Sequence, residues 1–207
     1  MKKPNQKEEN KLVGAGFKFV AGVDEAGRGA WAGPLVAAAV ILPAKHKIKG
    51  INDSKKLTPG QREMLYVKII KSSLAWSVHL VSHREIDRIG IGQANGRAIL
   101  RAIQKLKPSA DYVLIDALKV KFDTVPSQSI IKGDEKITSI AAASIIAKVT
   151  RDQIMTWQSK LYPAYCFHIH KGYGTALHLK ALKKYGQSAI HRRSFLPVKN
   201  AVKKKLK

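Results

Sequence analysis

The chain has 207 residues, 45% of them hydrophobic, so it is long enough to bury a sizeable core in one domain. Its 38 Lys and Arg residues outnumber 14 Asp and Glu residues, which gives a formal net charge of +24 at pH 7. This excess disfavours self-association, so we expect a monomer, and it favours a polyanionic partner, most simply nucleic acid. A thermophile-like surface of solvated lysines is the alternative, but it normally carries matching glutamate, which is scarce here.

Cysteine content and hydropathy limit the class of protein further. Cys166 is the only cysteine, which excludes an internal disulfide and a cysteine-based zinc site and agrees with a reducing environment. The opening segment, MKKPNQKEEN, lacks the apolar core of a secretory signal. The longest apolar run, residues 35–42, is far too short to cross a membrane. We therefore expect a cytoplasmic protein that does not contact membranes.

The first part of the chain predicts a charged arm followed by a strand-rich core. Residues 1–11 are mostly polar, and we expect them to form a flexible arm. The domain over residues 12–207 then begins with a strand at 19–24, a strand at 35–42, a helix at 58–71 and a strand at 75–82. Thr58, Pro59 and Gln61 indicate the helix start, because they suit the N-cap, the first helical position and a capping box.

The second part predicts further helices and strands, with a helical C-terminal extension from about residue 160. The expected elements are a helix at 94–106, strands at 112–116 and 128–131, a helix at 139–149, a helix at 175–185 and a basic tail at 191–207. The helix at 139–149 is apolar nearly all round, so it should be buried. This order predicts an α/β fold in which a mixed sheet carries helices on its faces.

Acidic residues stand next to these buried elements: Asp24, Glu25, Asp116 and Asp134. If the strands at 19–24 and 112–116 are parallel neighbours, their carboxyl ends bring Asp24 and Asp116 together. A carboxylate cluster in so basic a chain suits hard divalent cations, Mg²⁺ or Mn²⁺. Two such ions could activate water and stabilise the leaving oxygen in an in-line phosphodiester cleavage.

A structural role for the same acids is the alternative. Asp116 alone is typical of a strand-end turn, and Asp134 alone is typical of a helix cap. Asp24 and Glu25 are neighbours, and neighbours on a regular strand point to opposite faces. Both can reach one site only if the strand bends or ends there, which the glycines that follow permit.

Several segments resemble the sequence signature of bacterial ribonuclease HII. In the order of that family they are GVDEAGRG at 22–29 with AGP at 32–34, NDSKKLT at 52–58, LID at 114–116, IKGD at 131–134, SIAAASIIAKVTRD at 139–152, HKGYGT at 170–175 and HRRSF at 191–195. One short motif can arise by chance, whereas this many in register span nearly the whole chain and indicate a true relationship.

The resemblance implies a ribonuclease H-like fold, a five-stranded mixed sheet flanked by helices with a helical C-terminal extension. It implies endonucleolytic hydrolysis of RNA in RNA–DNA hybrids. It also implies cleavage on the 5′ side of ribonucleotides embedded in duplex DNA, leaving 3′-hydroxyl and 5′-phosphate ends. Such an enzyme would remove ribonucleotides during DNA repair and replication, using two Mg²⁺ or Mn²⁺ ions.

The same resemblance implies roles for particular residues. The catalytic metal ligands would be Asp24, Glu25, Asp116 and Asp134. The loop that reads the ribonucleotide would be Gly27, Arg28 and Gly29, since glycines let backbone groups approach a 2′-hydroxyl. Tyr173 would pack on the sugar of the next nucleotide, and Lys55 and Lys171 would contact phosphates.

Some positions depart from the family pattern. Ala30-Trp31 replaces the Pro-Leu of many members, and Ala117 stands where many have glycine, but neither change removes a metal ligand. The C-terminus lacks the glutamine-and-aromatic clamp-binding motif of archaeal relatives, which argues against a sliding-clamp partner by that route. His168, His170, His178 and His191 are interpreted as structural or substrate-contacting residues, because nothing in the acid-rich site needs an imidazole ligand.

Two other functions are compatible with the residues alone. A basic RNA- or ribosome-binding module would carry the acids as structural residues and would cleave nothing. Another ribonuclease H-like nuclease, such as a junction resolvase, would cut branched substrates made only of DNA.

Overall fold

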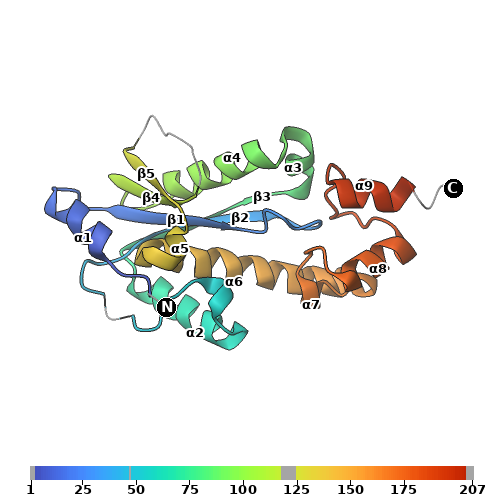
Figure 1. The fold of residues 1–207 in the computed structure, drawn as a ribbon, viewed down its shortest axis with the longest axis horizontal. Coiled ribbons are helices and arrows are strands. Elements are labelled where there is room, and N and C mark those ends of the chain that lie inside the picture. The colour runs from blue at the N-terminus through green and yellow to red at the C-terminus, as the bar shows by residue number, and fades with distance from the viewer. Residues whose placement is uncertain (1–2, 47, 118–124, 204–207) are drawn as a thin grey trace.

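The computed structural model describes residues 3–46, 48–117 and 125–203, arranged around a five-stranded sheet (Figure 1). The strands are β1 (Val20–Ala26), β2 (Leu35–Ile41), β3 (Ala75–Val81), β4 (Tyr112–Asp116) and β5 (Ser127–Ile130). They lie in the order β3-β2-β1-β4-β5. β2 is antiparallel to β1 and β3, whereas β4 is parallel to β1 and β5. The predicted mixed sheet is confirmed, and so is the parallel pairing of β1 with β4.

Helices cover both faces of the sheet (Figure 1). On one face lie α3 (His83–Ile89) and α4 (Ile91–Gln104), and α4 buries its alanines and isoleucines there. On the other face lies α6 (Thr138–Leu161), with α2 (Pro59–Ser72) against its outer side. The first half of α6 is apolar nearly all round because it is enclosed by the sheet and α2, as the sequence predicted for residues 139–149.

Strand β1 and helix α6 are in backbone contact. A Cβ atom on Gly22 would overlap the backbone of Ser139 and Ile140, so glycine is required at this crossing. The contact fixes α6 directly against the strand that carries Asp24 and Glu25.

The N-terminal segment is helical where the sequence predicted a flexible arm over residues 1–11. Residues Lys7–Gly14 form α1, and the Glu9 side chain is buried. The Glu9 carboxylate accepts hydrogen bonds from the Ser139 backbone N–H and Oγ, each at 2.9 Å. This places a negative charge at the N-terminus of α6, where the helix dipole favours it. The charged residues of this segment predicted disorder, but one of them, Glu9, attaches the segment to the start of α6.

The C-terminal third extends beyond the end of the sheet (Figure 1). Helix α6 continues past the predicted end at 149 to Leu161 and is followed by η2 (Pro163–Tyr165), α7 (Phe167–His170), α8 (Ala176–Tyr185) and α9 (Leu196–Lys203). The predicted helix at 175–185 is α8, which Thr175 caps. Helix α9 occupies part of the predicted basic tail, and the last tail residues, 204–207, lie outside the described residues. None of the helices within the described ranges is long and apolar enough to span a bilayer.

Candidate active site

Three carboxylates meet beside the carboxyl end of β4. Asp24 belongs to β1, Asp116 ends β4, and Asp134 lies in the short helix α5 (Gly133–Lys136). One ligand oxygen from each lies within 4.8 Å of the others. The β1–β4 pairing ends at Val23 and Ile115, so β4 terminates just where β1 presents its acids.

Glu25 lines the same cavity as Asp24 and Asp116 but does not belong to the three-acid cluster. Strand β1 continues to Ala26 instead of ending at Asp24, so the site is open because β4 stops and not because β1 does. Burial raises the pKa of Glu25, and the buried amide of Asn95 in α4 opposes that rise.

The cluster is electrostatically unfavourable without a cation. Burial, together with the charges of Glu25 and Asp116, raises the pKa of Asp24 well above its ordinary range. Burial also raises the pKa of Asp116, although the Gly133 N–H donates to its Oδ1 at 2.7 Å. Buried carboxylates that repel one another at this separation fit a hard divalent cation, which would replace repulsion with coordination.

Lys55 is a cationic side chain within reach of the cluster. It lies in η1 (Ser54–Lys56), whose first turn is capped by the buried Asp53. Its Nζ is 3.0 Å from Asp134 Oδ2 and 3.9 Å from Asp53 Oδ1. Partial burial lowers the pKa of Lys55, but the ion pair with Asp134 outweighs that effect and the pKa is raised overall.

The segment Gly27–Arg28–Gly29 is held by its backbone, while the Arg28 side chain is exposed. Gly27 has a φ of 91°, and a Cβ atom there would overlap the Arg151 side chain. Arg192 donates from Nη1 to the Arg28 carbonyl at 2.9 Å. Gly29 has open space where a Cβ would be. Arg151 and Arg192 therefore hold the inner side of the loop, and its outer side is free of contacts at Gly29.

Tyr173 lines the same cavity as the acids and this loop, a space of about 430 Å³. The Arg151 guanidinium lies 4.9 Å from the centre of its ring, and Lys148 Nζ lies 5.4 Å from it. Arg151 is fully buried and donates to the carbonyls of Ala32, Pro34 and Lys171. One arginine thus ties the Gly27 loop to the segment that carries Tyr173.

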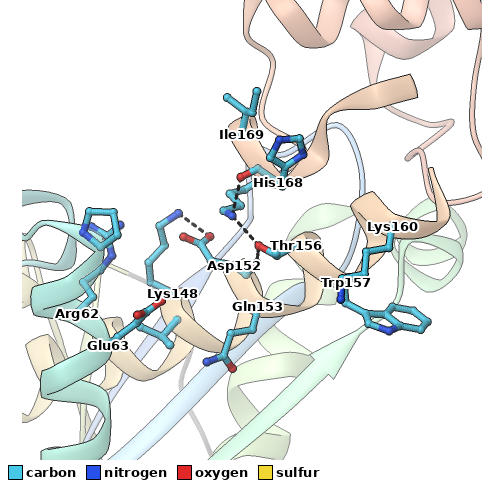
Figure 2. A pocket seen from close by; sticks show the side chains of 13 residues that line it. Arg62, Glu63, Lys148, Asp152, Gln153, Thr156, Trp157, Lys160, His168 and Ile169 are labelled. Atoms are coloured by element: carbon cyan, nitrogen blue, oxygen red, sulfur yellow. Dashed lines mark hydrogen bonds and ion pairs between the residues drawn. The ribbon is translucent and has the colours of Figure 1, made fainter. Parts of the chain in front are cut away.

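Lys171 lies outside this cavity. It lines a neighbouring cleft of about 600 Å³ between α2, α6 and α7, and its Nζ donates to Thr156 Oγ1 at 2.7 Å and to the His168 carbonyl at 2.8 Å. Lys148 lines both spaces, and its ion pair with Asp152 at 2.8 Å is visible in Figure 2. The structure therefore groups Lys55 with the acids and Lys171 with the cleft.

Helix α6 supplies site residues that the sequence analysis did not single out. Ser144 opposes the rise in the pKa of Asp24, and its Oγ forms a hydrogen bond with Ser54 Oγ at 2.8 Å. Ser144, Lys148 and Arg151 follow one another at spacings of four and three, so they share one face of the helix. A polar stripe in an otherwise apolar helix was the signal that could have found them.

Trp31, one of the departures from the family pattern, supports the Tyr173 segment. A Cβ atom on Gly174 would overlap the Trp31 ring, which also lies 5.3 Å from the His178 ring. The Trp31 backbone N–H donates to the Gly172 carbonyl at 2.8 Å. Trp31 is therefore a packing residue behind the cavity.

Comparison with known proteins agrees with this geometry. A family model described as ribonuclease HII matches residues 21–198. The chain belongs to the ribonuclease HII family. It is 48% identical over 197 residues to ribonuclease HII of Geobacillus sp. (strain WCH70), covering 95% of this chain and 71% of that protein. It is 50% identical over 188 residues to ribonuclease HII of Caldicellulosiruptor bescii, covering 91% of each.

The fold of the family agrees as well. The crystal structure of ribonuclease H2 from Pyrococcus horikoshii OT3 superposes with a TM-score of 0.79 at 30% identity, covering 92% of this chain and all of that one. As a ribonuclease HII family member, the chain is a metal-dependent endoribonuclease that hydrolyses RNA in RNA–DNA hybrids.

Proposed function

We propose that this enzyme also cuts duplex DNA on the 5′ side of single embedded ribonucleotides, leaving 3′-hydroxyl and 5′-phosphate ends. The observation that supports it is the shared cavity: Asp24 and Asp116 line the same space as the Gly27 loop and Tyr173. A residue that recognises one nucleotide must lie next to the residues that cleave beside it. The role of the enzyme in the cell would be to remove ribonucleotides from DNA.

The proposed metal ligands are Asp24, Glu25, Asp116 and Asp134. Asp24 is only 6% exposed, and its Oδ1 accepts a hydrogen bond from the Glu25 backbone N–H at 2.7 Å, which orients the carboxylate. Two Mg²⁺ or Mn²⁺ ions held there would supply positive charge at the scissile phosphate and ease deprotonation of the attacking water. Lys55 would exchange its ion pair with Asp134 for contact with a substrate phosphate.

The proposed recognition rests on backbone groups and one ring. The Gly27–Gly29 loop leaves its outer side free of side chains except for the exposed Arg28, so its amides and carbonyls can approach a 2′-hydroxyl, which both donates and accepts hydrogen bonds. Tyr173 would lie against the sugar of the following deoxynucleotide. Lys171 and Lys148 both line the cleft beside the cavity and would contact phosphates farther along the strand. The position of Lys148 is shown in Figure 2.

The experiment uses three labelled substrates: duplex DNA with one ribonucleotide, an RNA–DNA hybrid and an all-DNA branched junction. Each is incubated with Mg²⁺, Mn²⁺ or EDTA. We expect metal-dependent cleavage of the first two, with the single-ribonucleotide strand cut at its 5′ side. An intact single-ribonucleotide strand beside a cut hybrid would overturn the proposal, and a cut junction would indicate a different nuclease.

Asp24→Asn is the matched variant for this assay. It should abolish cleavage of both substrates while duplex binding, measured by fluorescence anisotropy in EDTA, changes little. Cleavage at near wild-type rate would show that Asp24 is not a required ligand.

A further inference from the structure

Three buried histidines lie behind the Tyr173 segment. The exposed fractions of His170, His178 and His191 are 6%, 0% and 1%. The His170 and His178 rings stack with centroids 4.3 Å apart, and the Nε2 atoms of His178 and His191 are 3.0 Å apart. Two ring nitrogens at that distance need one proton between them, so the tautomers of the two rings must be complementary.

The buried rings belong to a chain of hydrogen bonds that runs from Ser188 through His191 and His178 to the Tyr173 carbonyl. The direction of donation along this chain follows from the backbone N–H of Ser188. His191 Nδ1 has two contacts with Ser188, the backbone N–H at 2.9 Å and Oγ at 2.8 Å. The backbone N–H can only donate, so Nδ1 is an acceptor, the hydroxyl is oriented as a second donor, and the ring proton lies on Nε2. His191 Nε2–H therefore donates to His178 Nε2, which leaves the His178 proton on Nδ1. That Nδ1–H donates to the Tyr173 carbonyl at 2.9 Å.

His170 completes the arrangement on the neighbouring peptide. Its Nδ1 accepts from the Gly172 N–H at 3.2 Å, and its Nε2–H donates to the Tyr165 carbonyl at 2.7 Å. Each nitrogen of the three rings therefore has an assigned role. Gly172 and Tyr173 are held by an imidazole each.

We propose that His178 and His191 are positioning residues: their one-way hydrogen-bond chain sets the place of Tyr173 in the cavity, and with it the preference for a ribonucleotide followed by DNA. This inference rests on the role proposed above for Tyr173. The chain works only with neutral rings, because an added proton would set two N–H groups against each other at Ser188 or between the rings. Burial, together with nearby histidines, lowers the pKa of His178 to about 4 and that of His191 to about 3, so both rings are neutral at physiological pH.

Simple packing is the competing explanation, since both rings also contact Phe167. The two explanations predict different effects of replacing His178 by phenylalanine and by asparagine. His178→Phe keeps an aromatic ring but removes the donor to Tyr173, whereas His178→Asn can keep a donor near the Nδ1 position. Packing alone predicts that phenylalanine is the better replacement, and positioning predicts that asparagine is.

The kinetic test compares kcat/KM on a single-ribonucleotide duplex with kcat/KM on a long RNA–DNA hybrid. For His178→Phe we expect a loss of about tenfold on the first substrate, in line with one lost hydrogen bond, and less than about threefold on the second. His178→Asn should recover most of the loss. His79→Phe, the same replacement in the edge strand β3 and outside the lining of the cavity, is the matched control and should leave the ratio unchanged.

A double-mutant cycle shows whether His178 acts through Tyr173. In a Tyr173→Ala background the effect of His178→Phe on the substrate ratio should disappear. Equal losses on both substrates, or an undiminished effect without Tyr173, would overturn the inference. If the wild-type enzyme did not cleave at single ribonucleotides, the proposed function would be wrong. Failure of the proposed function can therefore be distinguished from failure of this inference.

NMR provides a test that is independent of activity and of any variant's folding. Imidazole nitrogen shifts of the wild-type protein at pH 6 to 7 should show protons on Nδ1 of His178 and on Nε2 of His170 and His191. Doubly protonated rings, or a His178 proton on Nε2, would rule out the chain.

Discussion

The ammonium of Lys55 lies 3.0 Å from Asp134 Oδ2, within the cluster that also contains Asp24 and Asp116. The Lys55 side chain is 76% exposed, so the pair is screened by solvent and weak enough to exchange. A metal ion bound by Asp134, as proposed above, would therefore compete with the Lys55 ammonium for the same carboxylate in the free enzyme.

Lys55→Ala should tighten Mn²⁺ binding to the free enzyme by about two- to fivefold, because an exposed ion pair contributes about 1 kcal/mol or less. The same change should weaken substrate binding if Lys55 contacts a phosphate. Isothermal titration with Mn²⁺ measures the first effect. Lys56→Ala is the control, since Lys56 pairs with Glu135 at 3.2 Å and Asp53, outside the cluster. Weaker Mn²⁺ binding by Lys55→Ala would contradict the competition.

Asp24→Asn should stabilise the metal-free protein at neutral pH. The pKa of Asp24 is raised in the folded state, so the wild type loses stability as pH rises from the ordinary carboxyl value of 3.8 through the raised folded value. Asparagine carries no such penalty. We expect a melting temperature higher by a few degrees, corresponding to about 1–2 kcal/mol, in EDTA at pH 7.

The pH series supplies the check on this assignment. The gap between Asp24→Asn and wild type should close as the pH falls below 3.8, where the carboxyl is protonated in both states. Asp111→Asn is the contrasting control, because Asp111 accepts from the backbone N–H groups of Lys18 and Phe19 and its loss should destabilise. A gap that does not depend on pH would mean that charge burial is not its cause.

Gly22→Ala should lower the free energy of unfolding by about 1–3 kcal/mol or more, because its methyl group would force β1 away from α6. Chemical denaturation measures the change. Gly96→Ala in α4 is the control of opposite sign, since its Cβ has open space and alanine favours a helix interior by about 0.5–1 kcal/mol. Equal stability of Gly22→Ala and wild type would show that the crossing can relax.

Tyr173→Ala should reduce cutting at a single ribonucleotide more than cutting within a long hybrid, because only the first substrate presents an isolated junction. The ratio of the two kcat/KM values is the measurement. Tyr185→Ala, which removes a 47% exposed ring from the end of α8, should leave that ratio unchanged. Equal losses on both substrates would leave Tyr173 without a junction-specific role.

The sequence predicted the sheet and the meeting of Asp24 with Asp116 because both depend on local patterns. Buried strands are short and apolar, and parallel neighbours bring their carboxyl ends to one edge. Docking of α1 was not predictable in this way, because Glu9 binds Ser139, 130 positions away, and charge pattern alone indicates a solvated segment. The histidine chain was hidden for a similar reason: its direction is set by Ser188, in a loop with no periodic signal.

Helix α6 carries Ser144 beside Asp24, Lys148 between the two spaces and Arg151 beneath the Gly27 loop. A residue inserted into α6 between Ser144 and Arg151 would turn everything after it by about 100°. The acid cluster would stay in place, but Arg151 would no longer face the loop or the Tyr173 segment. A substitution in α6 would thus change one side chain of the cavity, whereas a change in the length of α6 would separate the proposed sugar-recognition loop from the proposed metal ligands.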